Sequence, residues 1–166
     1  ISINLDYTDI LNPQIKKDLV SKIKSNNIGE YLTLEILESE KVSSFDTVNE
    51  FINDVKQFGV KIAIDDFGTG FSNYENILNL NIDYIKIDGS LIRKINEDIY
   101  LNLIKSIVLF SKQQNIKVVA EFVSDLKILR YVKNIEIDYS QGYYIGKPTH
   151  IQELFGEENE TTTKKD

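Results

Sequence analysis

The stretch Ile64-Asp65-Asp66-Phe67-Gly68-Thr69-Gly70-Phe71-Ser72 ends an aliphatic run with two adjacent carboxylates and continues into a glycine-rich loop. Two neighbouring carboxylates repel each other, so without a cation one of them would have to hold a proton. A pair of divalent ions about 3.5 to 4 Å apart removes this conflict and suits in-line phosphoryl displacement. The alternative is that Asp66 caps a helix and the glycines only form a tight turn. Gly68 and Gly70 would also let the loop move over a substrate.

Strand-like and helix-like segments alternate on both sides of this stretch, which is typical of βαβ units and a parallel sheet. Six strand-like runs cover residues 1–5, 31–37, 60–65, 82–88, 116–121 and 137–144. Between them, apolar residues recur at spacings of three and four, most clearly in 45–55 and 101–108. Local signals predict helix starts at Asp9, at Ser44 or Asp46 and at Ser124 or Asp125, and a helix end at Gly59.

One face of each predicted strand carries a polar residue near its carboxyl end: Asn4, Glu35, Asp65, Lys86, Glu121 and Gln141. Any single one could be a solvated strand end, but six in register favour the mouth of a (β/α)8 TIM-like barrel over an open doubly wound sheet. Such barrels take about 250 residues. The sequence therefore predicts an incomplete barrel of about six βα units, with the missing units expected before Ile1.

Composition narrows the function further. The chain has 166 residues and a formal charge of −7, which argues against binding to a DNA or RNA duplex. It has no Cys and a single His150, so a bound metal would be a hard cation held by oxygen. No membrane span or signal peptide is recognisable, so a cytoplasmic location is expected, although the parent protein could be membrane-anchored. We expect one domain over residues 1–155 and a polar tail over 156–166.

Four motifs follow one another along the chain: Asp65-Asp66-Phe67-Gly68-Thr69-Gly70, Ile85-Lys86-Ile87-Asp88, Val119-Ala120-Glu121 and Gln141-Gly142-Tyr143. In this order and spacing they resemble the EAL domain family, which consists of cyclic di-GMP phosphodiesterases and their inactive relatives. The likeness extends from Ile3-Asn4-Leu5, through Leu34-Glu35-Ile36-Leu37-Glu38-Ser39, to Lys147-Pro148. The resemblance implies a barrel fold and metal-dependent hydrolysis of cyclic di-GMP to linear pGpG by the full-length parent.

The resemblance also implies roles for particular residues. Two Mg²⁺ or Mn²⁺ ions would lie at the barrel mouth, with the first bound by Asn4, Glu35 and Asp65 and the second by Asp66. Lys86 would contact the phosphate or the attacking water, Glu121 would be a general base or a metal partner, and Gln141 would position water or ligand. Glu38 would steady the loop that contains Gly68, Thr69 and Gly70. Lys86 could instead pair with Asp83 or Asp88, and Glu38 could be an exposed residue.

Departures from the family pattern support a second hypothesis. The Glu-Ala-Leu signature has no counterpart in the chain, as expected if this fragment begins after it, and the fragment alone is then expected to be inactive. The segment Ala120-Glu121-Phe122-Val123-Ser124 has Phe and Ser where the family has Gly and Glu. The alternative function is therefore a degenerate domain that binds cyclic di-GMP, or another protein, without turnover. A homodimer and other signalling domains in the parent chain are further expectations.

Overall fold

Six parallel strands form one sheet in which spatial order follows chain order from β1 to β6. This computed structural model describes residues 1–37, 45–68 and 74–150, without the side chain of Asn76. The strands are β1 Ser2–Leu5, β2 Thr33–Leu37, β3 Lys61–Phe67, β4 Tyr84–Ile87, β5 Lys117–Ala120 and β6 Tyr139–Ser140. The helices are α1 Tyr7–Leu11, α2 Pro13–Asn26, the short 3-10 helix η1 Gly29–Tyr31, α3 Phe45–Lys56, α4 Tyr74–Leu78, α5 Gly89–Ile92, α6 Asp98–Gln113 and α7 Leu126–Asn134.

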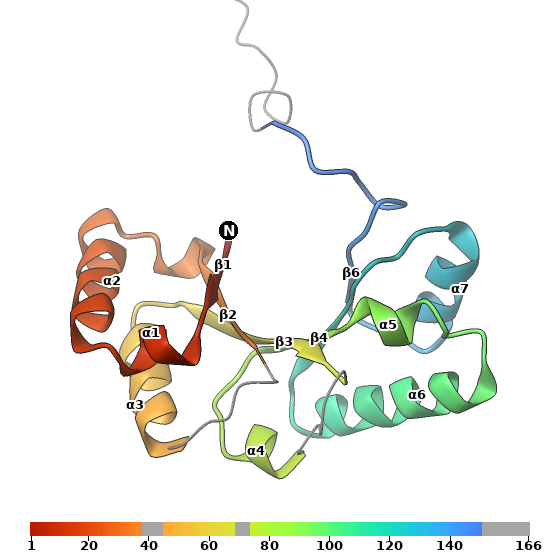
Figure 1. Cartoon of the computed structure of the whole chain (residues 1–166), viewed down its shortest axis with the longest axis horizontal. Coiled ribbons are helices and arrows are strands. Elements are labelled where there is room, and N and C mark those ends of the chain that lie inside the picture. The colour runs from red at the N-terminus through yellow and green to blue at the C-terminus, as the bar shows by residue number, and fades with distance from the viewer. Residues whose placement is uncertain (38–44, 69–73, 151–166) are drawn as a thin grey trace, which may run out of the picture.

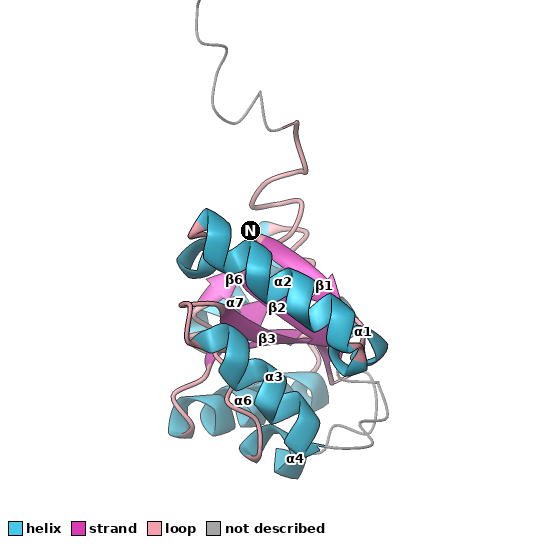
Figure 2. Ribbon diagram, turned by 90° about the vertical axis from the view of Figure 1, so that its left-hand side faces the viewer, coloured by secondary structure: helices cyan, strands magenta, loops and turns pink. Residues whose placement is uncertain are grey.

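The sheet is curved and carries most of its helices on the convex side (Figure 1). Seen from the side, α2 and α3 lie in front of the strands (Figure 2). The helix-facing residues of the strands are apolar and fully buried, as in Ile62, Ile85 and Val118. Within the described residues β1 and β6 pair on one side only. The chain therefore forms an incomplete α/β barrel, as predicted.

The concave face of the sheet is polar and encloses a cavity of about 300 Å³. Every strand contributes to its lining: Ser2, Thr33, Glu35, Ala63, Tyr84, Lys86, Val119 and Tyr139, with Gln141 just after β6. These residues alternate with the buried aliphatic residues that face the helices, as the pleat of a strand requires. The two faces predicted from sequence are thus confirmed.

The first helical segment consists of two helices, so the prediction that Asp9 precedes a single helix is wrong. Asp6 is the N-cap of α1, and Asp9 lies inside the helix, where its carboxylate accepts the Asp6 amide at 3.2 Å. Asn12 then ends α1 and caps α2, because its side-chain oxygen accepts two backbone amides of the next turn. Pro13 at the first position of α2 has no amide to satisfy, which suits a helix start.

Other predicted boundaries shift by a few residues. The helix α3 begins at Phe45, so Asp46 lies within its first turn, and Ser44 lies outside the described residues. Asp125 is the N-cap of α7, with Oδ1 2.9 Å from the Ile128 amide nitrogen. The last strand spans only two residues, far fewer than predicted. In the ranges described, no helix combines the length and apolar character needed to cross a membrane.

Candidate active site

Lys86 lies at the centre of the polar concave face and contacts three carboxylates. Its Nζ is 2.7 Å from Oε2 of Glu35, 2.8 Å from Oδ1 of Asp65 and 3.0 Å from Oε1 of Glu121. These acids come from β2, from β3 and from the residue after β5, so adjacent parallel strands bring them to one place. Lys86, Asp65 and Glu121 are buried, with exposed fractions of 7%, 9% and 4%. In the described part of the chain Lys86 has no ion pair with Asp83 or Asp88, the two alternatives considered above.

Asp66 joins this group because the strand β3 is irregular at its end. The register with β4 shifts between Ile64 and Phe67, and Asp66 has a φ of 55°. A bulge of this kind re-aims one side chain, so two consecutive carboxylates can serve the same site even though regular pleating would separate them. One oxygen of each of Asp65, Asp66 and Glu121 lies within 4.8 Å of the others.

Burial and neighbouring charges shift the pKa values of three residues in this cluster. Burial by itself lowers the pKa of Lys86, but hydrogen bonds to Asp65, Glu35 and Glu121 outweigh it and raise the pKa above its usual range. Burial raises the pKa of Glu121, and Lys86 offsets this only in part. Burial and the charges of Asp65 and Asp88 raise the pKa of Asp66. An added cation would favour the ionised forms of these acids.

The contacts to the cluster leave oxygens that could bind such a cation. Asp65 accepts both Lys86 and the Asp66 amide on Oδ1, and Glu121 accepts both Lys86 and Gln141 on Oε1. Among the described residues, Oδ2 of Asp65 and Oε2 of Glu121 take no hydrogen bond or ion pair. Carboxylate oxygens are the ligands that Mg²⁺ and Mn²⁺ prefer. The residues therefore fit a divalent ion held by Asp65, Asp66 and Glu121.

The remaining predicted site residues are not among the described carboxylates that contact Lys86. Gln141 donates from Nε2 to Glu121 at 2.6 Å and so orients that carboxylate. Asn4 is exposed and lies opposite Glu35 in the β1–β2 register. Gly68 has a φ of 98°, and a Cβ there would be 2.4 Å from Leu91. Glu38, Thr69 and Gly70 lie outside the described residues.

A second cavity of about 700 Å³ adjoins this site at Gln141. Phe122 and Ser124 line it from the loop after β5, and Arg93 lines it from the end of α5. Arg93 was not predicted from the sequence as part of this region. It belongs here because its side chain lies over the ring of Phe122, a residue that is distant in sequence. No local pattern around Arg93 marks that contact.

Comparison with known proteins places this geometry in a family. Residues 1–148 match the EAL domain family. Cyclic di-GMP phosphodiesterase PdeA of Borreliella burgdorferi is 42% identical over 130 residues, which cover 78% of this chain and 19% of that protein. Cyclic di-GMP phosphodiesterase PdeF of Escherichia coli is 32% identical over 158 residues, which cover 94% of this chain and 21% of that protein.

Solved structures agree with the sequence relatives. An EAL domain protein from Listeria monocytogenes EGD-e has a TM-score of 0.84 at 29% identity, over 93% of this chain and 62% of that one. The PaMucR phosphodiesterase, solved as a c-di-GMP complex, has a TM-score of 0.84 at 25% identity, over 93% and 63% of the two chains. The chain belongs to the EAL domain family. It spans about a fifth of the length of these curated relatives.

Proposed function

We propose that this chain carries the site at which a full-length phosphodiesterase hydrolyses one phosphodiester of cyclic di-GMP to give linear pGpG. The observation that carries the proposal is the cluster of Asp65, Asp66 and Glu121 around buried Lys86. The names of the relatives, which are cyclic di-GMP phosphodiesterases, support the substrate. Two Mg²⁺ or Mn²⁺ ions are the proposed cofactors. The cytoplasmic location, the homodimer and the additional signalling domains stay predictions.

In this proposal each residue has a distinct task. Bound divalent ions supply positive charge that polarises the phosphoryl oxygen and lowers the pKa of water. Asp65 and Asp66 hold the ions, with Asn4 and Glu35 as further ligands from the neighbouring strands. Glu121 accepts the proton of the attacking water as general base, because one of its oxygens lies within 4.8 Å of an oxygen of both aspartates. Lys86 stabilises the charge on the phosphate, while the water oxygen bonds to phosphorus and the bond to the ribose oxygen breaks. That oxygen takes up a proton from solvent and leaves as a hydroxyl.

The second candidate is a receptor that binds cyclic di-GMP without turnover. Phe122 favours it, because this bulky residue follows Glu121 directly and has a φ of 51°, where glycine is the usual choice. A small displacement of the proposed base would slow the chemistry far more than it weakens binding. Ser124, which lines the cavity beside Phe122, offers a neutral hydroxyl where the family pattern has a carboxylate.

The two candidates are separated by measuring turnover and binding together. The purified full-length protein is incubated with cyclic di-GMP in Mg²⁺, in Mn²⁺ and in EDTA, and the products are separated by chromatography. The enzyme proposal expects pGpG only with metal, and its loss in Asp66→Asn. The control Asp98→Asn removes an exposed acid of α6 and should keep the activity. Binding without pGpG supports the receptor, and neither binding nor turnover contradicts both functions.

A further inference from the structure

Phe122 has a backbone conformation that its own side chain does not favour. Its φ of 51° lies in the left-handed region, which is costly for a large residue. The side chain is 56% exposed, so burial does not offset this cost. Such conformations persist where the surrounding structure fixes them, and they cluster at active sites. Phe122 directly follows Glu121, so the strained residue lies next to the proposed base.

The left-handed turn at Phe122 lets its two neighbours face different surroundings. Glu121 and Val123 are two residues apart, so in a regular strand both would point to the same face. Here Glu121 contacts Lys86 on the polar concave face, whereas Val123 is fully buried in the hydrophobic core. The turn therefore directs the carboxylate of Glu121 into the site.

Backbone hydrogen bonds hold the residues on either side of the turn. The Glu121 amide donates to the Ile87 carbonyl at 3.2 Å, and the Val123 amide donates to the Gln141 carbonyl at 3.0 Å. Ile87 is the last residue of β4, and Gln141 is the first residue after β6. The segment is thus joined to both neighbouring strands, and the side chain of Phe122 adds a further contact between these bonds.

That contact is with Gly89, the first residue of α5. A Cβ on Gly89 would lie 2.4 Å from Cδ2, 2.6 Å from Cγ and 2.8 Å from Cβ of Phe122. Rotation of the ring would move Cδ2 and Cγ away, but the position of Cβ is set by the backbone. An alanine at position 89 would therefore shift the backbone of Phe122, and with it Glu121. Gly89 itself is buried and lines neither of the two cavities described above.

We propose that Phe122 is a positioning residue for Glu121, and that its packing on Gly89 keeps the carboxylate aligned with Lys86. This inference rests on the proposed function and adds to it the contact that holds the base. Gly89 follows Lys86 by three residues, so one short segment places both the cation that Glu121 contacts and the surface that supports Phe122. Arg93, just after α5, adds a cation–π contact, with Cζ 5.3 Å from the ring centroid.

The test is a double-mutant cycle of Gly89→Ala and Phe122→Gly in the full-length protein. Two quantities are measured: cyclic di-GMP hydrolysis at saturating Mn²⁺, and Mn²⁺ affinity by calorimetry without nucleotide. Gly89→Ala should lower kcat on the order of 100-fold with little change in KM, as a small displacement of a base does. It should also weaken Mn²⁺ binding by about tenfold, because Glu121 is one of the three acids that fit the ion.

The Phe122→Gly background is the matched control for the added methyl group. Phe122→Gly alone removes the support and should lower kcat by about tenfold. In that background the alanine at 89 meets no ring and should change neither kcat nor Mn²⁺ affinity further. Phe122→Tyr keeps the ring and should keep both values. If Gly89→Ala does not fold, the comparison of Phe122→Gly with Phe122→Tyr carries the test.

Three results would overturn the positioning role. The first is an equal loss from Gly89→Ala in both backgrounds, since the alanine would then not act through Phe122. The second is a higher kcat in Phe122→Gly than in the wild type, since the ring would then displace Glu121. The third is a lower melting temperature of Gly89→Ala with unchanged kcat and Mn²⁺ affinity, since Phe122 would then only pack on α5.

The same measurements separate this inference from the proposed function. If the wild type hydrolyses cyclic di-GMP and all variants match it, the positioning role is wrong and the proposed function stands. If the wild type binds Mn²⁺ but does not hydrolyse cyclic di-GMP, the proposed function is wrong, and the Mn²⁺ affinities of the cycle decide the positioning role. If the wild type does neither, both are wrong.

Discussion

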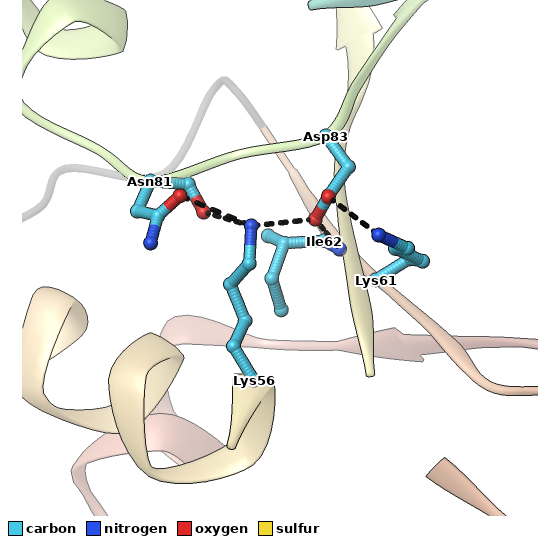
Figure 3. A network of polar contacts seen from close by, with 5 residues as sticks. All are labelled: Lys56, Lys61, Ile62, Asn81 and Asp83. Carbon is cyan, nitrogen blue, oxygen red and sulfur yellow. Dashed lines mark hydrogen bonds and ion pairs between the residues drawn. The ribbon is translucent and has the colours of Figure 1, made fainter. Parts of the chain in front are cut away.

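Two parts of the sheet, from α3 to β4 and from α6 to β6, have the same arrangement of polar contacts at the amino ends of their strands. The first residue of β3, Lys61, binds Asp83 just before β4, and the first residue of β5, Lys117, binds Asp138 just before β6. Each aspartate also accepts the amide of the second residue of that strand, at 2.9 and 3.0 Å. Figure 3 shows the first case, in which Lys56 adds a second ammonium at 2.8 Å.

The opposite ends of the same two parts differ. Each part carries an acid, then a residue with positive φ, and a polar residue on the next strand or just after it: Asp65, Asp66 and Lys86 in the first, and Glu121, Phe122 and Gln141 in the second. One part thus supplies a second carboxylate and an ammonium, and the other an aromatic ring and an amide. The contacts at the amino ends hold neighbouring strands together in both parts. The side chains at the carboxyl ends differ, so they determine what each part can do chemically.

The largest expected effect comes from making the first part resemble the second with Lys86→Gln. This removes the cation from a buried group of three carboxylates, which should lower the free energy of unfolding by about 3 kcal/mol or more at neutral pH. Carboxylates without their cation have raised pKa values in the folded state, so the variant should regain stability as the pH falls. Urea unfolding at pH 7 and pH 5 measures both changes.

Millimolar Mg²⁺ should restore part of this stability if the free oxygens bind a cation as proposed. The control is Lys105→Gln, which makes the same chemical change on the exposed surface of α6 and should be nearly neutral. Equal stability of Lys86→Gln and Lys105→Gln would mean that the three contacts to Lys86 contribute little, and would remove the basis for calling the carboxyl end a charged site.

The second prediction concerns Asp65, the first acid at the carboxyl end of the first part. Asp65→Asn replaces a proposed ligand oxygen by an amide and should lower the proposed cyclic di-GMP hydrolysis by the full-length protein by at least about 100-fold, since even residues that only orient metal ligands cost 10- to 100-fold. Chromatography of the products, with Mg²⁺ titrated, measures the rate and its metal dependence. An unchanged rate at low Mg²⁺ would show that Asp65 is not a metal ligand.

The third prediction tests whether the amino ends are equivalent. Burial raises the pKa of Asp83, but the hydrogen bonds from Lys56 and the Ile62 amide outweigh it, so the folded pKa is lowered. The pKa of Asp138 is lowered in the same way by Lys117 and the Val118 amide. A lowered folded pKa gives stability that is present above the unfolded value of about 4 and is lost as the pH falls through the folded value.

Asp83→Asn should therefore lower the free energy of unfolding by about 2 kcal/mol at pH 7 and by much less near pH 3. Asp138→Asn should cost less, about 1 kcal/mol, because its partner Lys117 is more exposed than Lys56. Guanidinium unfolding at the two pH values measures both. A loss of the same size at pH 3 would indicate that shape, and not charge, makes Asp83 important.

Much of this arrangement follows from sequence, because period-two alternation is a local property. It placed Glu35, Asp65, Lys86 and Glu121 on one face, and the structure brings these four into contact. The alternation applies only while a strand stays regular. It therefore could not show that the bulge at Asp66 turns a second carboxylate toward the first.

Other features depend on partners that are distant in sequence. Phe122 packs against Gly89 and Arg93, and neither spacing nor composition identifies these two residues as its partners. One helix start was predicted at Asp9, whereas the structure has α1 beginning after Asp6 and α2 beginning after Asn12. Residue type alone predicts where a cap is possible, not which candidate is used.

The smallest expected effect lies just after the helices α3 and α6, where the chain turns toward β3 and β5. Gly59 follows α3 with a φ of 86°, and Asn115 follows α6 with a φ of 57°. Asn115→Gly should change the free energy of unfolding by less than about 0.5 kcal/mol, because the better fit to positive φ is offset by the greater freedom of glycine in the unfolded chain. The reverse exchange, Gly59→Asn, should cost about 1 kcal/mol. A Cβ at Gly59 would lie 2.8 Å from Cγ of Glu30, so that side chain must move as well. Urea unfolding of both variants measures the asymmetry, and equal effects of opposite sign would show that the two helix ends differ only in residue type and not in their surroundings.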